Sequence, residues 1–235
     1  YASADASPAL ARESGLRHFG LLSAALMAAE RASNNTGLGR LFNAGGGNAS
    51  DRELDFFRIE RAKIYEHIYT ASQRLAADPQ FDFVVLHWPV PHPPGIYDRT
   101  RNRKQWTKKS NYFDNLELVD YTIGQVRQTM VEAKVWESTT LVLTADHPLR
   151  PNLYAKHSYW TQEEETLARL RKAERVPFLV KLAGQRSGIE YQGNFDTLRT
   201  RALLTAMMQG SVSSAEQVIE WLGRQQSANL AERRQ

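Results

Sequence analysis

Three short apolar runs divide the chain, and segments in which apolar residues recur at helical spacing lie between and after them. The runs are FDFVVLHW (81–88), TTLVLTA (139–145) and VPFLVKLA (176–183). Each has the length of a strand and is apolar almost throughout, which is typical of strands buried on both faces of a sheet. The alternation of such strands with helices predicts an α/β fold, with a mostly parallel sheet flanked by helices on both faces.

The helices that this pattern predicts begin at recognisable capping sequences. Ser50-Asp-Arg-Glu53 is a capping box, in which the side chain at each end bonds to the backbone N–H of the other. The segments 161–164 and 213–216 repeat this pattern. The predicted helices cover about 51–77, 113–130, 195–209 and 213–222, and a short charged helix opens at Thr161.

The first 50 residues differ in composition and are predicted to form a separate segment. Residues 9–32 are rich in alanine and leucine, with apolar residues at helical spacing, which predicts a helix. Residues 33–50 are rich in glycine and asparagine and have the composition of a loop or linker. We therefore divide the chain into a helical segment with its linker (1–50) and an α/β domain (51–235).

The composition narrows the class of protein only slightly. With 235 residues and 42% hydrophobic content, the chain can bury a sizeable core. Its 30 basic and 26 acidic residues leave a net charge of +4, which permits contact with nucleic acid but does not argue for it. Cysteine is absent, which excludes disulfides and thiolate metal ligands. Residue 1 is tyrosine and three strands are few for this length, so we expect the chain to be part of a longer polypeptide.

Two of the three predicted strands end in residues that can bind metals or anions. The first leads into LHWPVPHPPG, which places His87 and His92 among four prolines, and the second ends in Asp146 and His147. Because ligands of open parallel sheets bind beyond the carboxyl ends of the strands, these side chains are expected to be neighbours. Carboxylate and imidazole groups are common ligands of divalent cations, and His157 follows in a polar loop. Six cationic residues between 99 and 109 are suited to holding a phosphate or sulfate ester.

Each of these signals also has an ordinary structural interpretation. A histidine at the end of an apolar run is often part of the core, and an aspartate beside it is common in turns and helix caps. A basic loop is most often a solvated surface. The signals nevertheless converge on strand ends that are expected to be adjacent, and this convergence favours a site for a metal ion and an anion.

Three of these segments, in chain order, resemble the alkaline phosphatase superfamily, and most closely its sulfatase and phosphoethanolamine-transferase branch. HWPVPHPP is similar to the family's strand-end histidine, which is followed by a second histidine in a Gly- or Pro-rich turn. YFDNLELVDYTIGQVRQTM (112–130) resembles its Tyr-Asp-Asn helix, and WESTTLVLTADHPLR (136–150) resembles the strand that ends in Asp-His. The resemblance covers about residues 81–183 and implies the C-terminal part of an incomplete alkaline-phosphatase-like domain.

The resemblance also implies roles for individual residues. Metal binding would fall to Asp146 and His147, with His157 completing the metal or substrate shell. His92 would contact the phosphate or sulfate ester and His87 would support it from behind, while the cationic loop adds Arg99 to the residues expected to bind the ester. The implied cofactor is a divalent metal, zinc first, with manganese, calcium or magnesium as alternatives. Pro148 stands where the family usually has glycine after Asp-His, and it removes a backbone donor there.

In this family a metal-activated Thr, Ser or formylglycine attacks the ester and forms a covalent intermediate. We find neither that nucleophile nor the first metal carboxylate, since no apolar run ending in Asp or Glu precedes residue 81. The leading hypothesis is therefore the C-terminal portion of a metal-dependent phosphate- or sulfate-ester hydrolase or transferase. Its expected partner is the upstream part of the same polypeptide, without which we expect this chain to be inactive.

The resemblance further implies a membrane-anchored parent whose catalytic domain lies on the extracytoplasmic or periplasmic side. A degenerate, non-catalytic binding domain with the same fold is the alternative hypothesis, and Pro148 with the missing nucleophile favours it. A nucleic-acid binder that uses the 99–109 loop ranks last, because Trp106 is the one aromatic side chain in that loop.

Overall fold

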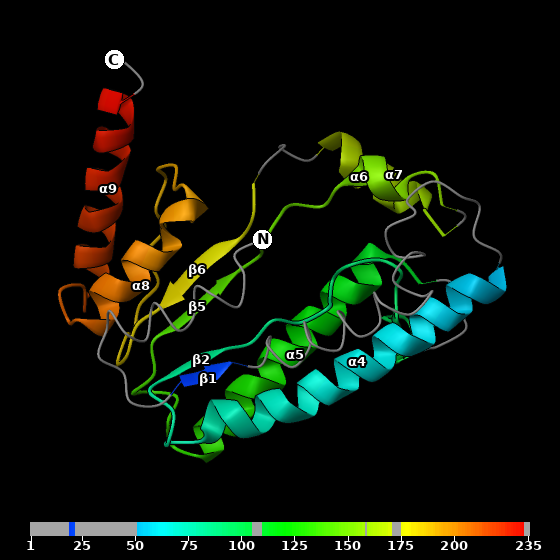
Figure 1. Cartoon of the computed structure of the whole chain (residues 1–235), viewed down its shortest axis with the longest axis horizontal. Coiled ribbons are helices and arrows are strands. Elements are labelled where there is room, and N and C mark those ends of the chain that lie inside the picture. Colours follow the sequence, from blue (N-terminus) through cyan, green and yellow to red (C-terminus); the bar gives the residue numbers. More distant parts are fainter. Residues whose placement is uncertain (1–18, 22–50, 105–109, 158, 171–174, 233–235) are drawn as a thin grey trace.

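The computed structural model describes residues 19–21, 51–104, 110–157, 159–170 and 175–232 (Figure 1). Two long helices, α4 (Asp51–Ala77) and α5 (Tyr112–Glu132), lie side by side. Both helices were predicted from the sequence. The predicted bounds of α4 agree with the structure, and the predicted α5 was slightly shorter than the observed helix. The predicted linker and most of the predicted N-terminal helix lie outside the described residues.

Apolar side chains and a pair of hydroxyl groups join α4 to α5. Tyr65 of α4 and Leu118 of α5 are buried in one cluster with Val90 and Ile96 from the chain between the helices. The Tyr65 hydroxyl lies 2.6 Å from Oγ1 of Thr122, which itself donates to the carbonyl of Leu118. Tyr65 is therefore the donor of this pair, since a hydroxyl has one proton to give.

The strands that the structure describes form three separate two-stranded pairings. They are β1 (Phe19–Leu21) parallel with β2 (Phe83–Val85), β3 (Tyr97–Asp98) antiparallel with β4 (Arg103–Lys104), and β5 (Leu141–Thr144) antiparallel with β6 (Phe178–Lys181). β2, β5 and β6 fall inside the three apolar runs, so the positions of the strands were predicted. A mostly parallel sheet is not confirmed, since two of these three pairings are antiparallel. The apolar pattern of a strand does not specify the direction of its neighbour.

The helix predicted for residues 9–32 is wrong at Phe19–Leu21, which form β1. In this strand Phe19 lies opposite Phe83 and Leu21 lies opposite Val85. Gly20 occupies the middle position, and glycine is a poor helix former. Backbone pairing with β2, which comes much later in the chain, therefore outweighs the local helical spacing.

In the part of the chain after β5 that the structure describes, there are five helical segments. They are α6 (Pro151–Tyr154), α7 (Gln162–Leu170), η1 (Thr197–Arg199), α8 (Thr200–Met208) and α9 (Ala215–Glu232). All except α6 correspond to predicted helices, and α9 extends further than expected. Across the described parts of the chain, no helix combines the length and the apolar character needed to cross a membrane.

β5 and β6 are not buried on both faces, contrary to the prediction from their apolar sequences. Phe178 and Val180 pack on the side of α8 and α9, in a cluster that includes Leu203 and Leu222. Leu179 lies between them in the strand, so its side chain points to the opposite face, where it is 55% exposed. Figure 1 shows α8 and α9 gathered beside this strand pair. The second and third apolar runs thus form a strand pair that α8 and α9 cover on one face.

Candidate functional site

The proline-rich loop that carries His92 is held in place by Asn115 of α5. Asn115 is completely buried, and its side-chain nitrogen lies 3.1 Å from the carbonyl of His92 and 3.4 Å from those of Pro91 and Pro94. Its side-chain oxygen accepts a hydrogen bond from the backbone N–H of Ile96 at 2.9 Å. Because one amide serves both a donor and several acceptors of the loop, Asn115 determines the path of the loop over α5.

Two further contacts hold the start of this loop against α4. The indole nitrogen of Trp88 donates to Oγ of Ser72 at 2.8 Å, and Nη1 of Arg61 donates to the carbonyl of Pro89 at 3.0 Å. The loop is therefore tied to both long helices. These ties explain how a segment without regular structure can present a histidine in a defined position.

The imidazole of His92 has a hydrogen-bond partner on each ring nitrogen. Nδ1 lies 2.7 Å from the carbonyl oxygen of Pro93, and Nε2 lies 2.6 Å from the hydroxyl of Tyr154. A carbonyl can only accept, so Nδ1 carries the proton. In the neutral ring Nε2 then has the lone pair and accepts the hydrogen bond from Tyr154. The two rings meet edge to face, with centroids 5.3 Å apart.

Burial, helped by the positive charge of Arg61, lowers the pKa of His92 from 6.5 to about 4. His147 also lowers this pKa, whereas the hydrogen bond to Pro93 and the negative charge of Asp146 raise it. His92 is therefore neutral at pH 7. The same influences show that His92 lies within electrostatic range of Asp146 and His147, as the position of these residues at strand ends predicted.

Asp146 and His147 follow directly after β5 and lie close to each other. Nε2 of His147 is 3.8 Å from Oδ2 of Asp146, and Nδ1 of His147 is 2.8 Å from the carbonyl oxygen of Pro148. The carbonyl again requires a proton on Nδ1, which leaves Nε2 as the atom that His147 can offer to a metal. Pro148 therefore orients the imidazole through its carbonyl group, even though it has no N–H to donate.

The spacing of Asp146 and His147 fits a shared divalent cation, but these two residues form only part of a ligand set. A zinc ion about 2.0–2.2 Å from each ligand atom can bridge a separation of 3.8 Å. Within the described residues, no group of three or more His, Asp or Glu side chains lies close enough together to hold a metal. The pair is thus suited to a cation whose other ligands come from elsewhere.

The structure does not bring His157 or His87 into a ligand group with this pair. The His157 ring stacks on Tyr159, with centroids 5.0 Å apart and planes 6° from parallel. His87 is exposed beyond the end of β2. Their predicted roles in metal and substrate binding remain predictions.

Arg99 takes part in ion pairs that join its loop to two helices. Its Nη2 lies 2.7 Å and 2.9 Å from the two carboxylate oxygens of Glu163, and its Nε lies 3.5 Å from Asp114. This contact lowers the pKa of Glu163. Two other cations of the loop are also paired, Arg101 with Asp98 and Lys104 with Glu66. Arg99 therefore links its loop to α5 and α7, and its predicted role in substrate binding remains a prediction.

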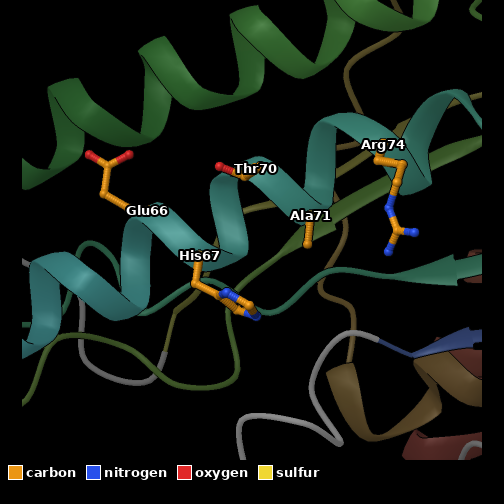
Figure 2. A pocket seen from close by; sticks show the side chains of 5 residues that line it. All are labelled: Glu66, His67, Thr70, Ala71 and Arg74. Atoms are coloured by element: carbon orange, nitrogen blue, oxygen red, sulfur yellow. The ribbon is translucent and has the colours of Figure 1, made fainter.

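A shallow groove along α4 has a volume of about 490 Å³ (Figure 2). Figure 2 shows that all five lining side chains come from this single helix; they are Glu66, His67, Thr70, Ala71 and Arg74. None of them belongs to the cluster around His92. Polar groups from several elements converge in a typical binding site, and this groove lacks that property.

A family model described as Sulfatase matches residues 27–206 of the chain. The match spans more than half of the chain, and the chain therefore belongs to the sulfatase family. No curated protein and no solved structure matches it.

Membership of this family confirms the resemblance to the alkaline phosphatase superfamily that the sequence motifs indicated. It implies an alkaline-phosphatase-like α/β fold and a domain of the sulfatase hydrolase or transferase type, with a sulfate ester as substrate. Members of the family are generally metal-dependent. The match begins before α4 and ends within α8, so it includes both the His92 loop and the Asp146–His147 pair.

Proposed function

We propose that this chain supplies a cation-binding pair and a substrate-facing histidine to an enzyme that hydrolyses or transfers a sulfate or phosphate ester. Asp146 and His147 would hold a divalent cation, zinc first, with manganese, calcium or magnesium as alternatives. His92 would face the ester. The observation that carries this proposal is the shared arrangement of the two histidines, whose Nδ1 atoms are both bound to the carbonyl of the following proline. Nε2 of His147 is therefore the atom available to a cation, and Nε2 of His92, which accepts from Tyr154, is the atom that would meet the ester.

The charges around His92 suit an anion. Arg61 is positively charged at all physiological pH values and influences both His92 and Tyr154. A bound sulfate or phosphate group would favour the protonated form of His92, because a nearby negative charge raises the pKa of an imidazole. Protonated His92 would then donate from Nε2 to an oxygen of the ester. A divalent cation at Asp146 and His147 would supply Lewis-acid stabilisation of the negative charge on the ester oxygens.

Other parts of the proposal rest on the family resemblance. We propose that the nucleophile and the remaining metal carboxylate come from another part of the polypeptide, and that His157 adds a further ligand. We also propose a parent protein anchored to a membrane, with this domain on the extracytoplasmic or periplasmic side. The division at residue 50 remains a proposed domain boundary.

Isothermal titration with Zn²⁺ and Mn²⁺ tests the cation pair. We expect binding by the unmodified chain and its loss in Asp146→Ala and His147→Ala. The matched controls are Asp120→Ala on α5 and His67→Ala on α4, which remove the same kinds of side chain from exposed positions and are expected to bind as before. Equal binding by all five proteins, or none by the unmodified chain, refutes the proposal and favours the non-catalytic domain.

A turnover assay tests the origin of the nucleophile. We expect no metal-dependent hydrolysis of an aryl sulfate or aryl phosphate by this chain alone. Hydrolysis that requires the metal and disappears in Asp146→Ala would show that the chain contains its own nucleophile.

A further inference from the structure

Tyr154 connects the two halves of the proposed site. It is the last residue of α6, and the segment 146–154 therefore carries both the cation pair and the partner of His92. His92 belongs to a loop that comes much earlier in the chain. The hydrogen bond between the Tyr154 hydroxyl and Nε2 of His92, 2.6 Å long, thus joins the proline-rich loop to the Asp146–His147 segment.

The direction of this hydrogen bond is determined by the rest of the structure. Nδ1 of His92 donates to the carbonyl of Pro93, so Nε2 of the neutral ring has only a lone pair to offer. Burial raises the pKa of Tyr154, so its phenol keeps the proton and donates it to this lone pair. With one nitrogen bound to the backbone and the other to Tyr154, rotation of the imidazole in either direction would break a hydrogen bond.

Two of the same charged side chains act on Tyr154 and on His92. Arg61 and Asp146 influence both side chains electrostatically, and Arg150 also acts on Tyr154. Burial and the carboxylate of Asp146 raise the pKa of Tyr154, whereas Arg61 and Arg150 lower it. The Tyr154 hydroxyl also occupies the nitrogen of His92 that a sulfate or phosphate oxygen would use.

We propose that Tyr154 is a positioning residue, whose hydroxyl fixes the orientation of the His92 ring through Nε2 until an anionic group takes its place. This inference rests on the proposed function, because it assumes that His92 meets the anion. Tyr154 makes no contact with the reacting bond in this arrangement and acts through His92.

The test compares the unmodified chain with Tyr154→Phe and with Tyr159→Phe. Both substitutions keep the aromatic ring, and Tyr159, which stacks on His157, serves as the control for loss of a buried hydroxyl. The first measurement is the ¹⁵N resonance of His92 Nε2 at pH 7. In Tyr154→Phe we expect it to move toward the value of an imidazole nitrogen that accepts no hydrogen bond. Inorganic sulfate is then titrated, and we expect binding to tighten roughly three- to tenfold, because the anion no longer has to displace one hydrogen bond from Nε2 of His92.

An unchanged Nε2 resonance in Tyr154→Phe, or the same shift in Tyr159→Phe, overturns the inference. A shifted resonance with unchanged sulfate affinity overturns it as well, since the anion would then not replace the Tyr154 hydroxyl at Nε2 of His92. Failure of the unmodified chain to bind Zn²⁺, while sulfate binding still depends on Tyr154, refutes the proposed cation site and leaves the role of Tyr154 supported. The two proposals can therefore fail separately.

Discussion

His92 is expected to make the folded chain sensitive to mild acid. Its pKa is lowered from 6.5 to about 4, so its contribution to stability is fully present above pH 6.5 and is lost as the pH falls toward 4. Below pH 6.5 the unfolded chain takes up a proton at His92, whereas the folded chain does not. From these two pKa values, the free energy of unfolding that depends on His92 is lower than its value above pH 6.5 by about 2 kcal/mol at pH 5. At pH 4 it is lower by about 3 kcal/mol.

Urea denaturation between pH 7 and pH 5 measures this effect. Other groups titrate in the same range, so the quantity to compare is the loss of unfolding free energy in the unmodified chain and in His92→Gln. We expect the unmodified chain to lose about 2 kcal/mol more than the variant. His67→Gln, which replaces an exposed histidine of α4, is the control and should follow the unmodified chain. Equal losses in the unmodified chain and His92→Gln would refute the reasoning, and an NMR titration of His92 would locate the error.

Two further predictions concern residues that shape the site. Asn115→Ala should lower the free energy of unfolding by roughly 3 kcal/mol, because it leaves several buried groups of the His92 loop without a partner. Urea denaturation measures this, and a loss below about 0.5 kcal/mol, as expected of exposed Asp120→Ala, would contradict it. Arg99→Ala should cost less than about 1 kcal/mol and leave the affinity for inorganic sulfate unchanged, because Arg99 is half-exposed and paired with Glu163. A tenfold loss of sulfate affinity would instead support its predicted role in substrate binding.

The helices were the most predictable part of the fold, because their signals are local. The capping box before α4 and the apolar spacing along α5 depend on residues within a few turns of one another. α5 also begins with a capping box at Asn111, which was not among the predicted helix starts. α6 was not predicted because four residues are too few to show a helical period.

The candidate site was predicted only in part. Asp146, His147 and His92 were expected to be neighbours from their positions at strand ends, and the electrostatic influences on His92 agree with this. Asn115 belongs to the family's Tyr-Asp-Asn motif, and this membership could have indicated a role for its amide. Nothing in the local sequence indicated Tyr154, since its partner is an imidazole 62 residues away.

The sequence by itself determined the bounds of α4, the presence and approximate extent of α5, which apolar runs form strands, and that the chain resembles the sulfatases. Capping, apolar spacing and motif order are all properties of short stretches, so they can be read without a fold. Only the tertiary structure decided that β5 and β6 pair antiparallel, that Phe19–Leu21 form a strand, and that Tyr154 rather than Arg99 contacts the His92 cluster. These outcomes depend on hydrogen bonds and burial between segments far apart in the chain, and no local pattern specifies such partners.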